Sequence, residues 1–218
     1  MTVLNVAMFG SDELAKEIAK ATDQRDVHTY VHKESKEGVA KIISIIRPAR
    51  YPDRLRPLLN AISAGRVGII EISAIDATLG EVLVAFASSS IEFGIAVVRP
   101  KDGDWVDQEM AEKMFAQAGL NKWKFMAPDG VVIRNQLYDL MDEIQDELTN
   151  SAASPLVVSI DQYFNVKGIG LVAIGYVQCG TLKVHDELHI LPSKGGGNTK
   201  SLQVMDDDVQ TAQSGDRV

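Results

Sequence analysis

Two residues near the amino terminus, Gly10 and Lys16, have the spacing of the first glycine and the lysine in phosphate-binding loops of the pattern G-x-x-x-x-G-K-[ST]. Such a loop binds phosphate through converging backbone N–H groups, the lysine charge and a hydroxyl group on Mg²⁺. Here the second glycine is Ala15 and the hydroxyl-bearing residue is Glu17. The Cβ atom of Ala15 obstructs the backbone approach, and Glu17 places negative charge where a triphosphate would lie. The sequence therefore favours an ordinary βα turn, with nucleotide binding as the alternative.

A second group of candidate residues is a set of closely spaced arginines: Arg47, Arg50, Arg54 and Arg56. These side chains could bind an anion or the phosphates of an RNA, but a solvated basic turn is the favoured interpretation. The four histidines do not have metal-ligand spacing to a cysteine or carboxylate cluster, so no structural metal site is predicted.

The elements that must position these residues alternate between strand and helix. A buried-strand pattern over residues 2–9 precedes Gly10, and a helical pattern follows with Leu14, Ile18 and Ala21 on one face. Further helical patterns cover residues 107–118, with Met110, Met114 and Phe115 facing inward, and residues 135–148. This alternation predicts an α/β domain with a mostly parallel sheet over residues 1–150.

A different pattern begins after the small polar segment 149–154, which we interpret as a linker. Residues 154–192 read SPLVVSIDQYFNVKGIGLVAIGYVQCGTLKVHDELHILP, in which short apolar runs are separated by glycine turns. Such spacing predicts an all-β barrel or sandwich over residues 151–218. Residues 193–198 are expected to be a flexible tip, and a strand is expected at 201–205.

Composition narrows the possible classes of protein. The net charge of −8 argues against a protein that coats nucleic acid nonspecifically. A lone cysteine, Cys179, excludes a disulfide framework and fits a reducing cytoplasm. The chain contains no apolar run long enough to cross a bilayer, and its first residues do not have the basic region of a signal peptide. A cytoplasmic protein is therefore expected, with neither membrane nor DNA among its partners.

Residues 154–192 closely resemble the second domain of translation elongation factors of the Tu and SelB type. That family reads I-D-x-x-F-x-x-K-G-x-G-x-V-x-x-G-x-V-x-x-G-x-L-K-V-x-D-x-x-x-I-L-P in this stretch, and the match runs without a gap. The resemblance implies a GTPase-like domain followed by a translation-factor barrel that stops short of its last strands at residue 218. It also implies aminoacyl-tRNA and the ribosome as partners and GTP as a possible cofactor, with the role of Mg²⁺ open.

The segment from residue 47 to residue 102 resembles the middle of a translational GTPase domain, but with altered chemistry. The family motif D-x-P-G-H aligns with residues 47–51, which read Arg-Pro-Ala-Arg-Tyr, and N-K-x-D aligns with residues 99–102 and keeps only Asp102. Hydrolysis needs positioned water, Mg²⁺ and phosphate clamps together. The resemblance therefore implies a degenerate GTP site, formed at most by Gly10, Lys16 and Asp102, with weak or absent hydrolysis and no catalytic residue.

In the barrel the resemblance implies a pocket for the aminoacyl end of tRNA. The wall around the amino acid corresponds to Asp161, Gln162, Phe164 and Arg217, and the strand at the terminal adenosine to Gln203, Val204 and Met205. The alternative is that Asp161 caps a turn and Arg217 pairs with an acid of residues 206–208.

The sequence thus predicts a SelB-like factor, similar to the divergent SelB-like homologues of methanogenic archaea for which pyrrolysyl-tRNA has been suggested. A noncatalytic pseudo-GTPase module that binds a translation partner or RNA is the alternative. An unrelated nucleotide or anion binder that uses Lys16 and the arginines is a third hypothesis.

Overall fold

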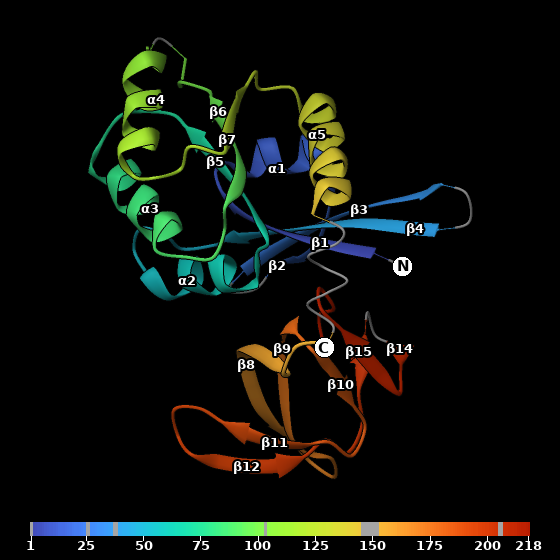
Figure 1. The fold of residues 1–218 in the computed structure, drawn as a ribbon. Helices are drawn as coiled ribbons and strands as arrows, with labels where there is room; N and C mark the ends of the chain where they lie inside the picture. Colours follow the sequence, from blue (N-terminus) through green and yellow to red (C-terminus); the bar gives the residue numbers. More distant parts are fainter. Residues whose placement is uncertain (1, 25–26, 37–38, 103, 145–152, 205–206) are drawn as a thin grey trace. The chain divides into compact units, whose positions relative to one another are not determined.

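The computed structural model describes residues 2–24, 27–36, 39–102, 104–144, 153–204 and 207–218 (Figure 1). The chain divides into two compact units, Met1–Glu143 (unit 1) and Ile144–Val218 (unit 2). Among the described residues, no helix has the length and apolar character needed to span a membrane.

Unit 1 is built on a seven-stranded sheet in the order β2-β3-β4-β1-β5-β6-β7. The strands are β1 (Thr2–Phe9), β2 (Lys20–Gln24), β3 (Val27–Lys36), β4 (Val39–Pro48), β5 (Val67–Ile72), β6 (Phe93–Val98) and β7 (Trp123–Met126). The ladders from β4 through β1, β5 and β6 to β7 are parallel, and β2, β3 and β4 pair antiparallel at one edge. β1 and β5 consist mainly of apolar residues and are mostly buried, as expected for strands covered on both faces.

In the described part of the chain, five helices cover this sheet: α1 (Asp12–Ile18), α2 (Leu55–Ala64), α3 (Ala77–Ala87), α4 (Gln108–Gln117) and α5 (Gly130–Glu143). Figure 1 shows α1 beside α5, while α2, α3 and α4 lie on the opposite side. The core beneath α2, α3 and α4 includes Trp123, whose indole packs edge-on against Phe86 and Phe115. Gly68 and Gly94 make room for this indole, because a Cβ atom at either position would lie 2.3 or 2.5 Å from its ring atoms.

Unit 2 consists of short strands that pair in antiparallel twos. The pairs are β8 (Val157–Val166) with β9 (Gly170–Cys179), β10 (Thr181–Lys183) with β15 (Thr211–Gln213), β11 (Glu187–Ile190) with β12 (Gly195–Asn198), and β13 (Gln203–Val204) with β14 (Asp207–Asp208). A small core of Val177, Leu182, Leu202, Val204 and Ala212 holds them together. The predicted fold class, a mostly parallel α/β domain followed by an all-β region, is confirmed.

The end of the first helix differs from the prediction. Ala21 does not extend the apolar face of that helix, because α1 ends at Ile18 and Ala21 pairs with Tyr30 in the edge strand β2. The guanidinium of Arg134 on α5 donates to the Ile18 carbonyl (2.5 Å) and the Glu17 carbonyl (2.8 Å), which satisfies the last turn of α1.

Three further details were wrong. The side chain of Met110, expected to face inward on α4, is 48% exposed. Helix α5 begins five residues before the predicted start, because the Asp129 carboxylate accepts hydrogen bonds from the N–H groups of Val131 and Val132 (2.9 and 3.0 Å). The expected flexible tip at 193–198 contains strand β12, whose glycines pair with β11. Residues 149–152 of the predicted linker lie outside the described residues.

Candidate functional site

The turn between β1 and α1 carries the first candidate residues. Gly10 ends β1, and Ser11 caps α1 by accepting a hydrogen bond at its side-chain oxygen from the Leu14 N–H (3.2 Å). The turn packs against its surroundings without spare room, since a Cβ atom at Gly10 would lie 2.9 Å from both Cβ and Oε2 of Glu71. Glycine is therefore needed here for close packing against β5.

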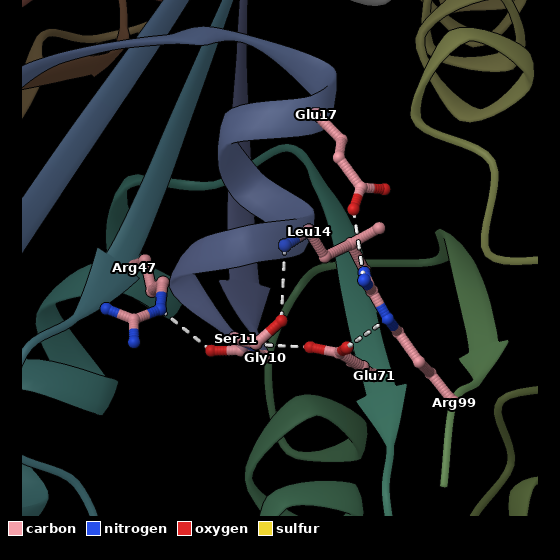
Figure 2. A network of polar contacts seen from close by, with 7 residues as sticks. All are labelled: Gly10, Ser11, Leu14, Glu17, Arg47, Glu71 and Arg99. Atoms are coloured by element: carbon pink, nitrogen blue, oxygen red, sulfur yellow. Dashed lines mark hydrogen bonds and ion pairs between the residues drawn. The ribbon is translucent and has the colours of Figure 1, made fainter. Parts of the chain in front are cut away.

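Glu71 on β5 is the acidic partner of this turn. Glu71 is only 7% exposed, and its Oε2 atom accepts a hydrogen bond from the Ser11 N–H (Figure 2). The register explains the contact, because Phe9 pairs with Ile70 and the next residues of the two parallel strands are Gly10 and Glu71. A carboxylate of the chain itself thus lies against a backbone N–H group of the β1–α1 turn.

Arg99 joins this carboxylate from the end of the neighbouring strand β6. Its Nε lies 3.8 Å from Oε1 of Glu71, and its Nη2 donates to Oε1 of Glu17 on α1 at 3.0 Å (Figure 2). The backbone N–H of Arg99 donates to the Ile72 carbonyl (2.9 Å), which fixes the start of the side chain. The Arg99 Nη1 atom is buried and has no hydrogen-bond partner within the described part of the chain.

Arg47 approaches the turn from β4. Its Nε donates to the Gly10 carbonyl oxygen at 2.7 Å, and its Nη1 donates to Nδ1 of His28 at 3.3 Å. Arg47 is therefore a structural partner of the turn and only partly solvated, whereas Arg50, Arg54 and Arg56 are exposed. We refer to Gly10, Ser11, Glu17, Arg47, Glu71 and Arg99 as the β1–α1 network.

Lys16 does not point its charge into this network but pairs within its own helix. Its ammonium group lies 2.5 Å from Asp12, whose carboxylate also accepts a hydrogen bond from the Tyr30 hydroxyl at 2.5 Å. The bonds from Lys16 and Tyr30 lower the pKa of Asp12, and burial raises the pKa of Tyr30 to about 12. The lysine charge is therefore already compensated by a neighbouring carboxylate.

The two remaining motif positions of unit 1 lie outside the network. Asp102 is exposed in the turn after β6. Tyr51, which stands at the position of the family histidine, donates from its hydroxyl to Oε2 of Glu81 (2.9 Å) and packs edge-on against Phe9. Burial is the main cause that raises the pKa of Tyr51 to about 12, so this side chain is a neutral hydrogen-bond donor at neutral pH.

In unit 2 the structure places Asp161 and Arg217 on the two sides of β9. Asp161 is the extra residue of a β-bulge in β8, because Ile160 pairs with Gly175 and Gln162 with Ile174. Arg217 pairs with Tyr176 on the other edge of β9, and its guanidinium lies 5.8 Å from the centre of the Tyr176 ring. Asp161 is 9% exposed and Tyr176 is fully buried, and the guanidinium of Arg217 approaches the Tyr176 ring.

The other predicted pocket residues of unit 2 differ from one another in their exposure to solvent. Gln162 is partly buried, and the ring of Phe164 is 43% exposed. Gln203 is exposed and donates from its amide to Oδ1 of Asp208 (2.9 Å), whereas Val204 belongs to the core of the unit. Met205 lies outside the described residues. Within the described residues, no group of three His, Cys, Asp or Glu side chains could hold a metal ion.

Glu71 is the residue of the site that sequence reasoning missed. A signal was present, because Glu71 is the single charged residue in the apolar run VGIIEI, and a carboxylate inside a buried strand must be paired. Its partner followed only from the register between β1 and β5.

Comparison with known proteins gives relatives of two kinds. The chain is 31% identical over 219 residues to the uncharacterized protein MJ0325 of Methanocaldococcus jannaschii, an alignment that spans 100% of this chain and 67% of the relative. It is 35% identical over 86 residues to the selenocysteine-specific elongation factor of the same species, which covers 39% of this chain and 18% of that factor. An elongation factor 1-alpha of Thermofilum pendens is 34% identical over 82 residues, or 38% of this chain and 19% of the factor. No family model matches the chain.

Two solved structures share the fold. The structure of SelB from Methanococcus maripaludis in complex with the GTP analogue GppNHp superposes with a TM-score of 0.67 at 20% identity, over 100% of this chain and 51% of that one. A bacterial selenocysteine-specific elongation factor superposes with a TM-score of 0.68 at 20% identity, over 99% of this chain and 41% of that one. The chain belongs to the family of the Methanocaldococcus jannaschii protein MJ0325 and is a homologue of the SelB and elongation factor 1-alpha translation factors.

Proposed function

We propose that this chain is a SelB-like translation factor homologue of the cytoplasm that binds aminoacyl-tRNA at the ribosome, with weak or absent GTP hydrolysis. Homology to the selenocysteine-specific and 1-alpha elongation factors supports a role in translation. The chain spans less than a fifth of each of these two factors in the alignments, so the tRNA and the ribosome are proposed partners.

The observation that carries tRNA binding is the placement of Asp161 and Arg217 on either side of β9. A carboxylate can bind the ammonium group of an aminoacyl ester, and a guanidinium can bind its carbonyl oxygen or a nearby phosphate. The partly exposed ring of Phe164 offers an apolar surface for the amino acid side chain or the terminal base. Together these groups can recognise an ester with a free ammonium group on the ribose of an adenosine whose base lies nearby.

The β1–α1 turn supports weak or absent GTP hydrolysis, because its residues do not fit a triphosphate in their present arrangement. The Ser11 N–H is bound by the Glu71 carboxylate, and the Lys16 charge is bound by Asp12. Glu17, at the position of the magnesium-binding hydroxyl, pairs with Arg99. The groups on which a GTPase depends are therefore occupied by side chains of the chain itself.

The same observation favours the rival function, a noncatalytic module that binds a translation partner or RNA without a nucleotide cycle. Equilibrium titration of the whole chain with labelled GTP, GDP and ATP, with and without Mg²⁺, tests the degenerate site that both functions share, and ester protection then separates the two functions. We expect no saturable binding at submillimolar nucleotide. Tight binding of GTP would contradict the degenerate site and favour an ordinary elongation-factor cycle.

Protection of the aminoacyl ester from hydrolysis tests the tRNA role, and the resemblance to the methanogen homologues makes pyrrolysyl-tRNA the first substrate to compare with others. We expect the chain to slow ester hydrolysis, and Asp161→Ala and Arg217→Ala each to weaken that protection about tenfold or more. Glu187→Ala, which removes an exposed carboxylate from β11, is the matched control. If neither the chain nor any variant protects an aminoacyl-tRNA, the pocket assignment fails.

A further inference from the structure

We propose that Glu71 is a built-in anion that takes the place of a phosphate in the β1–α1 turn and closes the turn to free anions. The contact is autoinhibitory, because the donor that would meet a phosphate oxygen is held by a carboxylate of the same chain. This inference concerns unit 1 alone and does not depend on tRNA binding by unit 2.

The burial of Glu71 is the first argument. An ionised carboxylate loses much of its hydration when it is 7% exposed, and this cost is compensated only by direct hydrogen bonds and an opposite charge. Glu71 obtains one of each, from the Ser11 N–H and from the Arg99 guanidinium. The same two kinds of donor, a loop N–H and a nearby cation, bind phosphate oxygens in proteins.

The balance of charges around the turn is the second argument. Lys16, Arg47 and Arg99 supply three positive charges, and Asp12, Glu13, Glu17 and Glu71 supply four negative charges. Removal of the Glu71 carboxylate cancels the excess of negative charge and leaves the Ser11 N–H without its acceptor. Arg99 already has one buried nitrogen, Nη1, without a partner among the described residues, so an incoming anion would find a free donor.

The packing of Gly10 is the third argument. The atoms nearest to the position that a Cβ atom would take on Gly10 are Cβ and Oε2 of Glu71 and Cε of Met8, each at 2.9 Å. Truncation of Glu71 removes the carboxylate while Gly10 keeps the backbone approachable. The vacated volume then lies between Gly10, Ser11 and Arg99, where a tetrahedral oxyanion has donors to meet.

Titration with inorganic anions tests the proposal on the whole chain. Thermal unfolding is followed while sulfate or pyrophosphate replaces chloride at constant ionic strength, for the unaltered chain, Glu71→Ala and Glu71→Gln. We expect the oxyanion to raise the melting temperature of Glu71→Ala by about 3 °C or more, because a ligand stabilises the state that binds it. The unaltered chain and Glu71→Gln, which keeps the volume and an acceptor oxygen, are expected to gain no more than the charge control.

The control for the change in net charge is Glu92→Ala, which also removes one carboxylate. Glu92 is exposed and precedes β6, whereas Arg99 follows the opposite end of that strand. Glu71→Ser provides a second opened variant if Glu71→Ala does not fold, and Arg99→Gln combined with the opened variant is expected to abolish the gain. An equal gain in the unaltered chain would show that the turn is already open, and no gain in either opened variant would show that Glu71 does not occupy an anion site. Both outcomes leave the ester-protection test of unit 2 unaffected.

Discussion

Replacement of Arg99 by methionine gives the sharpest test of the charges within unit 1. The substitution keeps most of the apolar stem of the side chain but removes the cation beside Glu71 and Glu17. Breaking a fully buried ion pair costs roughly 3–5 kcal/mol, because it leaves an uncompensated buried charge. Arg99 is one-third exposed, and Glu71 keeps its bond from the Ser11 N–H, so we expect a loss of about 2 kcal/mol.

Urea unfolding followed by tryptophan fluorescence measures this loss in unit 1 selectively, because both tryptophans lie there. Trp123 is buried in the core and reports unfolding, whereas Trp105 is exposed in the folded state. Lys122→Met, which breaks the exposed pair with Glu92, is the control and is expected to cost about 0–1 kcal/mol.

A double variant makes the reasoning refutable. If the loss arises from an unpaired buried carboxylate, Glu71→Gln should recover a large part of the stability lost in Arg99→Met, with a coupling free energy of about 1–2 kcal/mol. Additive effects of the two substitutions, or a loss in Arg99→Met no greater than that in Lys122→Met, would refute an energetic link between Arg99 and Glu71.

Three further outcomes are expected. Gly68→Ala should lower the unfolding free energy by about 1–3 kcal/mol in urea titrations, because its Cβ would lie 2.3 Å from the indole of Trp123. Gly80→Ala in α3 has open space around the new Cβ and should raise the unfolding free energy by about 0.5–1 kcal/mol, and equal effects of the two substitutions would contradict this packing. The pKa values of Tyr30, Tyr51 and Tyr138 are raised to about 12, so the stability that these residues contribute is fully present below pH 10 and is lost as pH rises through 12. Tyrosinate absorbance measured together with the melting temperature checks this expectation, and titration of all tyrosines near pH 10 without unfolding would disprove it. Asp129→Ala should cost about 1 kcal/mol and fray the first turn of α5 in hydrogen exchange, whereas Asp139→Ala on the outer face of that helix should cost less; equal losses would refute the capping role.

The order of elements in unit 1 could be read from the sequence where an apolar run is nearly continuous. β1 and the apolar runs that became β4, β5 and β6 have few alternatives to a buried parallel strand. β2 was missed because the short run KATDQ has no periodic apolar pattern and is held at the edge by pairing with β3, including a hydrogen bond from the Thr22 hydroxyl to the Thr29 carbonyl (3.0 Å). Edge pairing depends on the partner strand, which a local pattern does not contain.

The candidate site shows the same division between local and distant information. The departures at Ala15 and Glu17 could be read from a motif, because the motif fixes which residue types bind phosphate. The contact between Ser11 and Glu71 spans sixty residues and depends on the register of β1 against β5. Likewise, the placement of Asp161 and Arg217 on the two sides of β9 requires a bulge in β8 and a bridge between Tyr176 and Arg217. Such contacts follow from tertiary packing and leave no signal in spacing alone.

The position of Glu71 has a consequence for how the protein responds to its surroundings. An anion attached to the chain cannot be diluted, hydrolysed or exchanged, and its effective concentration at the turn exceeds the millimolar level that even a flexible tether provides. A diffusible phosphate compound must outcompete that local concentration before it can enter. The conformation of the β1–α1 turn is therefore expected to stay the same whether guanine nucleotides in the cell are abundant or scarce.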